Sequence, residues 1–107
     1  MVYSINELKN KIAPLAVKYN LYAVYIFGSY ARNEATEDSD VDILINRTGS
    51  TIKGIGIGGL YNELCESIGK QIDLITTSTL EQESIIQQTP WFVENLKKER
   101  VLLYERQ

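Results

Sequence analysis

The sequence contains no histidine among its 107 residues. This absence excludes catalytic triads built on an imidazole base and zinc sites of the usual histidine-containing kind. A general base in this chain is therefore a carboxylate, a lysine, a tyrosine or a water molecule. The single cysteine, Cys65, leaves no partner for an intrachain disulfide, which fits a reducing compartment.

Long apolar runs and excess positive charge are also missing. The sequence has no stretch of about 18 apolar residues, so it predicts no transmembrane helix. The N-terminal MVYSINELKNK lacks the apolar core of a signal peptide. We therefore expect a cytoplasmic protein with no membrane partner. The net charge of −3 argues against direct nucleic-acid binding, which depends on basic side chains. It does not argue against one nucleotide held through a metal ion, because the ion supplies positive charge.

The remaining composition is that of a globular protein, with 44% hydrophobic and 23% charged residues. The length predicts a single domain over residues 1–107. Helix caps and apolar periodicity predict helices or helical turns at 5–19 (with a kink or division at Pro14), 30–33, 60–68, 78–88 and 90–98. Strands are predicted at 21–27, 41–46, 71–76 and 101–104. This order indicates a mixed α/β fold, a small mixed β-sheet flanked by helices.

Two carboxylates stand at alternate positions around the start of the second predicted strand. Alternate strand residues share a face, so Asp40 and Asp42 project together while Val41 and Ile43 point into the core. Carboxylates roughly 6–7 Å apart repel each other when both are charged and desolvated. A divalent cation between them removes that conflict.

Asp73 interrupts the apolar third strand, QIDLIT. On a neighbouring strand about 4.8 Å away it joins Asp40 and Asp42 on one face. Three carboxylates form an all-oxygen site that favours Mg²⁺ or Mn²⁺, and two such ions stabilise the attacking and leaving oxygens of a phosphoryl group. The alternative is an ordinary ion pair of Asp73 with Lys70 or Arg47.

Gly28 and Ser29 directly follow the first predicted strand. The glycine allows the backbone to approach a ligand closely, and amides opening a helical turn attract anions. The serine hydroxyl adds a donor for a phosphate oxygen. Arg32 either contacts a phosphate or forms a surface salt bridge with a nearby glutamate, Glu34 or Glu37. Ser39 either binds phosphate or caps the entry to the second strand.

Two further patterns have alternative explanations. The glycine-rich segment 54–59 fits G-x-G-x-x-G, but it does not directly follow a strand, so we expect a loop or loose helix start near the site rather than a dinucleotide fingerprint. Trp91, Phe92 and Leu96 form an apolar stripe, which indicates core packing or, alternatively, a partner-binding surface.

The spaced motif resembles that of a known family. Gly28-Ser29, ten intervening residues and then Asp40-Val41-Asp42, within FGSYARNEATEDSDVDILI, is similar to the minimal nucleotidyltransferases of the polymerase-β-like superfamily. Where that family often has glycine after Ala-Arg, this chain has Asn33. The resemblance implies the nucleotidyltransferase fold, metal binding by the aspartates, and nucleotide phosphates held by Gly28 and Ser29. It also implies that Asp73 completes the carboxylate set and helps to deprotonate the acceptor.

The same resemblance implies a specific function. Many minimal nucleotidyltransferases act as antitoxins of HEPN toxins, which cleave RNA, and members of the family transfer AMP from ATP to a toxin tyrosine. We therefore expect a magnesium-dependent protein adenylyltransferase with ATP as donor and a HEPN toxin as partner, in a possible hetero-oligomer. Two alternatives remain open: a non-catalytic antitoxin that acts by occlusion, and transfer to a small molecule. Relatives that modify small molecules usually carry an additional helical domain.

Overall fold

The computed structural model describes residues 2–50, 54–77 and 90–106. Its elements follow an order close to the predicted one: α1 (Ile5–Lys18), β1 (Ala23–Phe27), α2 (Gly28–Ala31), β2 (Val41–Asn46), α3 (Gly54–Ile68), β3 (Ile72–Thr76), α6 (Pro90–Glu99) and β4 (Val101–Glu105). The four strands form one mixed sheet in the order β3-β2-β1-β4. β1 runs antiparallel to β2 and β4, and β2 runs parallel to β3. The predicted fold class is confirmed.

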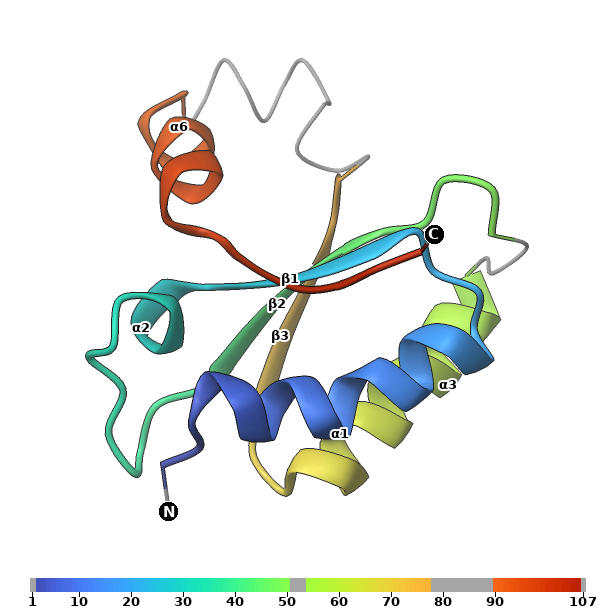
Figure 1. Cartoon of the computed structure of the whole chain (residues 1–107), viewed down its shortest axis with the longest axis horizontal. Coiled ribbons are helices and arrows are strands. Elements are labelled where there is room, and N and C mark those ends of the chain that lie inside the picture. The colour runs from blue at the N-terminus through green and yellow to red at the C-terminus, as the bar shows by residue number, and fades with distance from the viewer. Residues whose placement is uncertain (1, 51–53, 78–89, 107) are drawn as a thin grey trace.

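Helices cover both faces of the sheet. Figure 1 shows α1 and α3 lying side by side on one face, with α6 on the other side of the strands. The larger core lies under α1 and α3, and includes the residues of β2 that alternate with Asp42: Val41, Ile43 and Ile45. The smaller core lies under α6, where Leu44 and Phe27 pack against Val93 and Leu96. Both faces of β1 and β2 are therefore apolar, and Asp42 interrupts the face beneath α6.

The predicted capping box begins α1. The Ser4 hydroxyl accepts a hydrogen bond from the Glu7 amide at 3.1 Å, and the Glu7 carboxylate accepts one from the Ser4 amide at 2.9 Å. Two amides of the helix end are thereby satisfied. Pro14 lies inside one continuous helix, so the division considered from the sequence does not occur.

Two helix starts differ from the sequence prediction. The short helix α2 begins at Gly28, two residues before the expected turn, so the Gly-Ser motif forms its first two residues. The glycine-rich segment is the start of α3. It follows the end of β2 that is opposite to Asp42, and a Cβ built on Gly59 would lie 3.3 Å from the Tyr19 hydroxyl. The expectation that this segment lies near the site is therefore wrong.

The helix predicted from the second capping box, at 78–88, lies outside the described residues. The helix predicted from Pro90 is present as α6. Lys97 and Lys98 lie in its last turn, where the helix dipole favours positive charge. In the part of the chain that the structure describes, no helix combines the length and apolar character needed to cross a membrane.

Candidate active site

The site begins where β1 passes into α2. Gly28 has φ +70°, a conformation that side chains disfavour, and a Cβ added there would lie 2.0 Å from Oδ2 of Asp42. The carboxylate of Asp42 therefore packs directly against the Gly28 backbone. This contact follows from the sheet, because Phe27 pairs with Asp42 across β1 and β2. Gly28 is required here for both its φ angle and its lack of a side chain.

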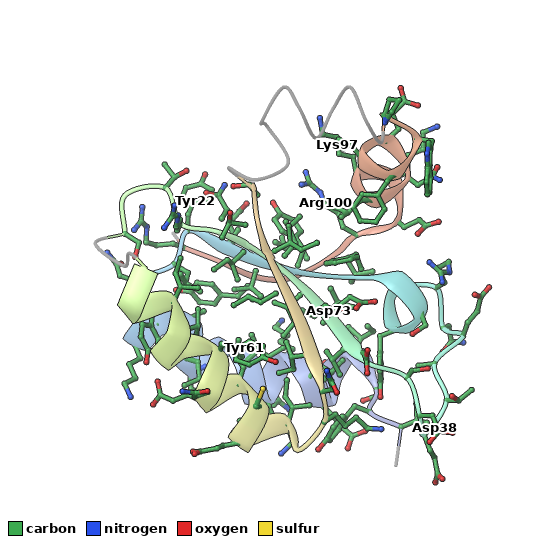
Figure 2. The ribbon with its side chains drawn as sticks, turned by 180° about the vertical axis from the view of Figure 1, so that it is seen from behind. Tyr22, Asp38, Tyr61, Asp73, Lys97 and Arg100 are labelled. Atoms are coloured by element: carbon green, nitrogen blue, oxygen red, sulfur yellow. The ribbon has the colours of Figure 1, made fainter. Side chains whose placement is uncertain are left out.

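Asp42 pairs with Asp73 across the parallel strands β2 and β3. Residues in register share a face, and the carboxyl group of Asp73 interacts with that of Asp42 closely enough to raise its pKa. Figure 2 shows Asp73 on β3 beside the strand that carries Asp42. The prediction that these two carboxylates meet on one face is confirmed, whereas the alternative partner Lys70 donates instead to the carbonyl of Glu37, at 2.8 Å.

Partial burial and like charge change the acidity of Asp42. Desolvation raises its pKa most, and the hydrogen bond and negative charge of Asp73 raise it further, from 3.8 to about 6. The charge of Asp40 acts in the same direction, and that of Arg32 opposes it. Close carboxylates that retain a proton in this way are suited to a cation, which replaces the proton and removes the repulsion.

Asp40 lies in the exposed turn just before β2. Among the described residues, no group of three or more Asp, Glu, His or Cys side chains is close enough to hold a metal ion. Asp42 and Asp73 lie side by side on paired strands, whereas Asp40 affects Asp42 only through its charge. The oxygen-only donors fit Mg²⁺ or Mn²⁺. A three-carboxylate metal site remains a prediction.

The polar side chains predicted around the motif have partners within the protein. Arg32 forms ion pairs with Glu34 (Nε–Oε2, 3.0 Å) and with Glu99 (Nη1–Oε2, 3.1 Å). The Ser39 hydroxyl accepts a hydrogen bond from the Thr36 amide at 2.9 Å. The salt bridge considered for Arg32 is therefore present, whereas the Ser39 hydroxyl bonds the preceding loop rather than the start of β2. The phosphate contacts of both residues remain predictions.

Ser29 is half-buried in the first turn of α2. Its carbonyl accepts a hydrogen bond from the Glu34 amide at 2.8 Å, which fixes the chain that leaves the helix. Phosphate binding by Gly28 and Ser29 remains a prediction.

A pocket of about 210 Å³ opens beside Gly28 and Asp42 and is closed on its other side by α6. The sequence analysis recognised three of the α6 residues that line it, Trp91, Phe92 and Leu96, as an apolar stripe, but missed Asn95 and Glu99. Trp91, Asn95 and Glu99 recur every four residues, which places them on one helix face. That period was visible in the sequence, although the side of the sheet on which α6 packs was not.

A four-stranded mixed sheet with a Gly-Ser turn packed against an aspartate of the next strand defines a nucleotidyltransferase domain. Comparison with protein families gives a match to the family of polymerase β nucleotidyltransferases over residues 10–107. The chain belongs to this family and is a nucleotidyltransferase.

Named relatives share substantial sequence with this chain. A Methanocaldococcus jannaschii protein, provisionally named a protein adenylyltransferase, is 42% identical over 77 residues, covering 72% of this chain and 82% of that protein. The protein adenylyltransferase MntA of Thermococcus cleftensis is 37% identical over 68 residues, covering 62% of this chain and 66% of its own length.

Solved structures share the fold. A chain of a toxin–antitoxin complex with AMP-PNP superposes with a TM-score of 0.68 and 23% identity, over 92% of this chain and 74% of that one. A chain of the complex between the tri-AMPylated Shewanella oneidensis HEPN toxin and its antitoxin superposes with a TM-score of 0.64 and 20% identity, over 95% and 73% of the two chains.

Proposed function

We propose that this chain transfers AMP from ATP to a tyrosine hydroxyl of a HEPN toxin and so acts as its antitoxin, with residues 1–107 forming one catalytic domain. The observation that carries the proposal is the contact of the Asp42 carboxylate with both Gly28 and Asp73. It places the turn that would hold phosphates against the carboxylates that would hold a divalent ion. The names of the relatives support a protein acceptor, and the AMP-modified HEPN toxin in a structure of the same fold supports this class of partner.

In this reaction the acceptor oxygen attacks the α-phosphorus, the bond between the α- and β-phosphates breaks, and pyrophosphate leaves. Gly28 and Ser29 orient the phosphates through backbone amides and the hydroxyl. Asp42, with Asp40 and Asp73, would hold Mg²⁺, which would stabilise the charge on the attacking and leaving oxygens. Asp73 accepts the proton of the acceptor hydroxyl. Its side chain is exposed, so a side chain of another protein can reach it.

The test is a label-transfer assay. The protein is incubated with Mg²⁺, ATP labelled on the α-phosphate, and the protein encoded by the neighbouring gene. We expect label on the partner with the unmodified chain and none with Asp42→Asn. Asp38→Asn is the matched control, because it removes the same charge from the exposed loop before β2, which Figure 2 shows away from Asp73. Transfer by Asp42→Asn would refute the proposed role of the carboxylates.

The occlusion mechanism remains the second candidate, and the 65% exposure of Trp91 favours it. An exposed aromatic residue beside Phe92 is typical of a protein-binding surface. Under this mechanism, Asp42→Asn still neutralises the partner and Trp91→Ala does not. A partner that is bound and inhibited without acquiring label would support occlusion over transfer.

A further inference from the structure

We propose that the pocket between α6 and the Gly28 turn is the binding site for the adenine base of the nucleotide donor, with Trp91 and Phe92 as its stacking surface and Asn95 as the residue that hydrogen-bonds the edge of the base. This inference rests on the proposed function, since it assigns part of the ATP molecule to residues outside the Gly-Ser and aspartate motif. It also assigns a role to three α6 residues that the motif does not include.

The pocket has an aromatic end. The rings of Trp91 and Phe92 lie 6.2 Å apart in an edge-to-face arrangement, with an interplanar angle of 85°. Phe92 packs against the core formed by Phe27 and Leu44, so its position is fixed by the sheet. Trp91 is 65% exposed although it lines the pocket, so much of its ring surface is available to a flat ligand. Every base can stack on such a ring.

The other end of the pocket is charged. Arg32 and Glu99 form an ion pair across it, and Gly28 and Asp42 belong to the same lining. Trp91 and Glu99 are eight residues apart on α6, a distance of about 12 Å along the helix. A ligand with an aromatic group and phosphates suits this lining, because the same pocket offers the ring of Trp91 and the backbone of the Gly28 turn. The pocket is thus continuous with the candidate active site.

Asn95 lies between the two ends, one helical turn from both Trp91 and Glu99, and lines the pocket. Its amide offers a donor and an acceptor side by side. Adenine presents the complementary pair, an amino group beside a ring nitrogen, which is the pairing that asparagine makes with adenine in nucleic acids. Asn95 can therefore hold adenine in this pocket through two hydrogen bonds, one to the amino group and one to the adjacent ring nitrogen.

The chain contains one tryptophan, so its fluorescence reports on this pocket alone. We expect Mg²⁺-ATP to quench the fluorescence of Trp91, and Mg²⁺-tripolyphosphate, which has no base, to leave it unchanged. Calorimetry then compares variants. Trp91→Ala is expected to weaken ATP binding by about 5- to 150-fold and to leave tripolyphosphate binding unchanged, whereas Trp91→Phe retains most of the affinity. Asn95→Leu is expected to weaken ATP binding and to leave tripolyphosphate binding unchanged.

Tyr22→Ala is the matched control, because Tyr22 is an exposed aromatic residue that does not line the pocket, and Figure 2 shows it well apart from Lys97 of α6. The inference is overturned if Trp91→Ala binds ATP as tightly as the unmodified chain, or if tripolyphosphate quenches as strongly as ATP. Loss of partner binding by Trp91→Ala with unchanged ATP affinity would also overturn it, and would identify a docking surface. These results are separate from the label-transfer test, in which Asp42→Asn decides the proposed function.

Discussion

Replacing Asp42 by asparagine is expected to stabilise the protein while removing its activity. The pKa of Asp42 is raised from 3.8 to about 6, so the fold favours the protonated carboxyl. The stabilisation that comes from protonated Asp42 is fully present below about pH 4 and is lost as the pH rises through about 6. At neutral pH the ionised carboxylate therefore lowers the free energy of unfolding. Asparagine keeps a donor for Asp73 and carries no charge.

The size of the effect follows from the pKa. Each pKa unit corresponds to about 1.4 kcal/mol, so the full shift would correspond to about 3 kcal/mol. Asp42 is only half-buried and solvent screens its interactions, which reduces the expected gain to about 1–2 kcal/mol. For a domain of this length, that gain raises the melting temperature by roughly 5–10 °C.

The assay is thermal unfolding between pH 4 and pH 8 in a chelating buffer, which removes divalent cations. We expect Asp42→Asn to be more stable than the unmodified chain at pH 7.5 and equally stable near pH 4. Asp38→Asn, which makes the same change in net charge on the surface, is expected to stay within about 0.5 kcal/mol. Mg²⁺ then stabilises the unmodified chain more than Asp42→Asn, because binding to the native state adds stability. An Asp42→Asn variant that is no more stable at pH 7.5, or a gain that is the same at every pH, would refute the reasoning.

Three further substitutions test the local structure. Gly28→Ala is expected to cost more stability than Gly69→Ala and to abolish AMP transfer. Both glycines have φ near +70°, where an alanine adds about 1–3 kcal/mol of backbone strain. Only Gly28 also faces the carboxylate of Asp42, which an alanine side chain would displace. If chemical denaturation shows the same loss of stability for both variants, the clash with Asp42 costs no stability. Tyr30→Phe is expected to be neutral or to stabilise by up to about 1 kcal/mol, because the buried Tyr30 hydroxyl has no hydrogen-bond partner among the described residues. A clear loss of stability would reveal a partner. Ser4→Ala removes the capping box of α1 and is expected to lower the free energy of unfolding by about 1 kcal/mol, measured by thermal unfolding. Unchanged stability would contradict this prediction.

Local patterns predicted several elements closely. The strand VDILIN was expected at 41–46 and is β2, Val41–Asn46, because its apolar residues pack on both faces of the sheet. The helix from Ser4 was identified by a capping box, which depends on four consecutive residues. At the start of α3 the sequence left a loop and a loose helix start as alternatives, because the glycines weaken the helical pattern. The structure has the helix start, which packing of the later residues Leu60 and Leu64 supports.

The candidate site also combines features that the sequence predicts with features that only the tertiary structure shows. The sequence by itself determined the Gly-Ser turn, the carboxylates and their shared face, since strand alternation places Asp42 and Asp73 on one side once their strands pair. Only the tertiary structure decided the strand order, which brings Asp42 against Gly28, and the position of α6, which brings Glu99 to Arg32 across 67 residues and forms the pocket. The physical reason is that periodicity specifies which face of an element is apolar, whereas the face against which it packs depends on the competition among all apolar surfaces of the chain.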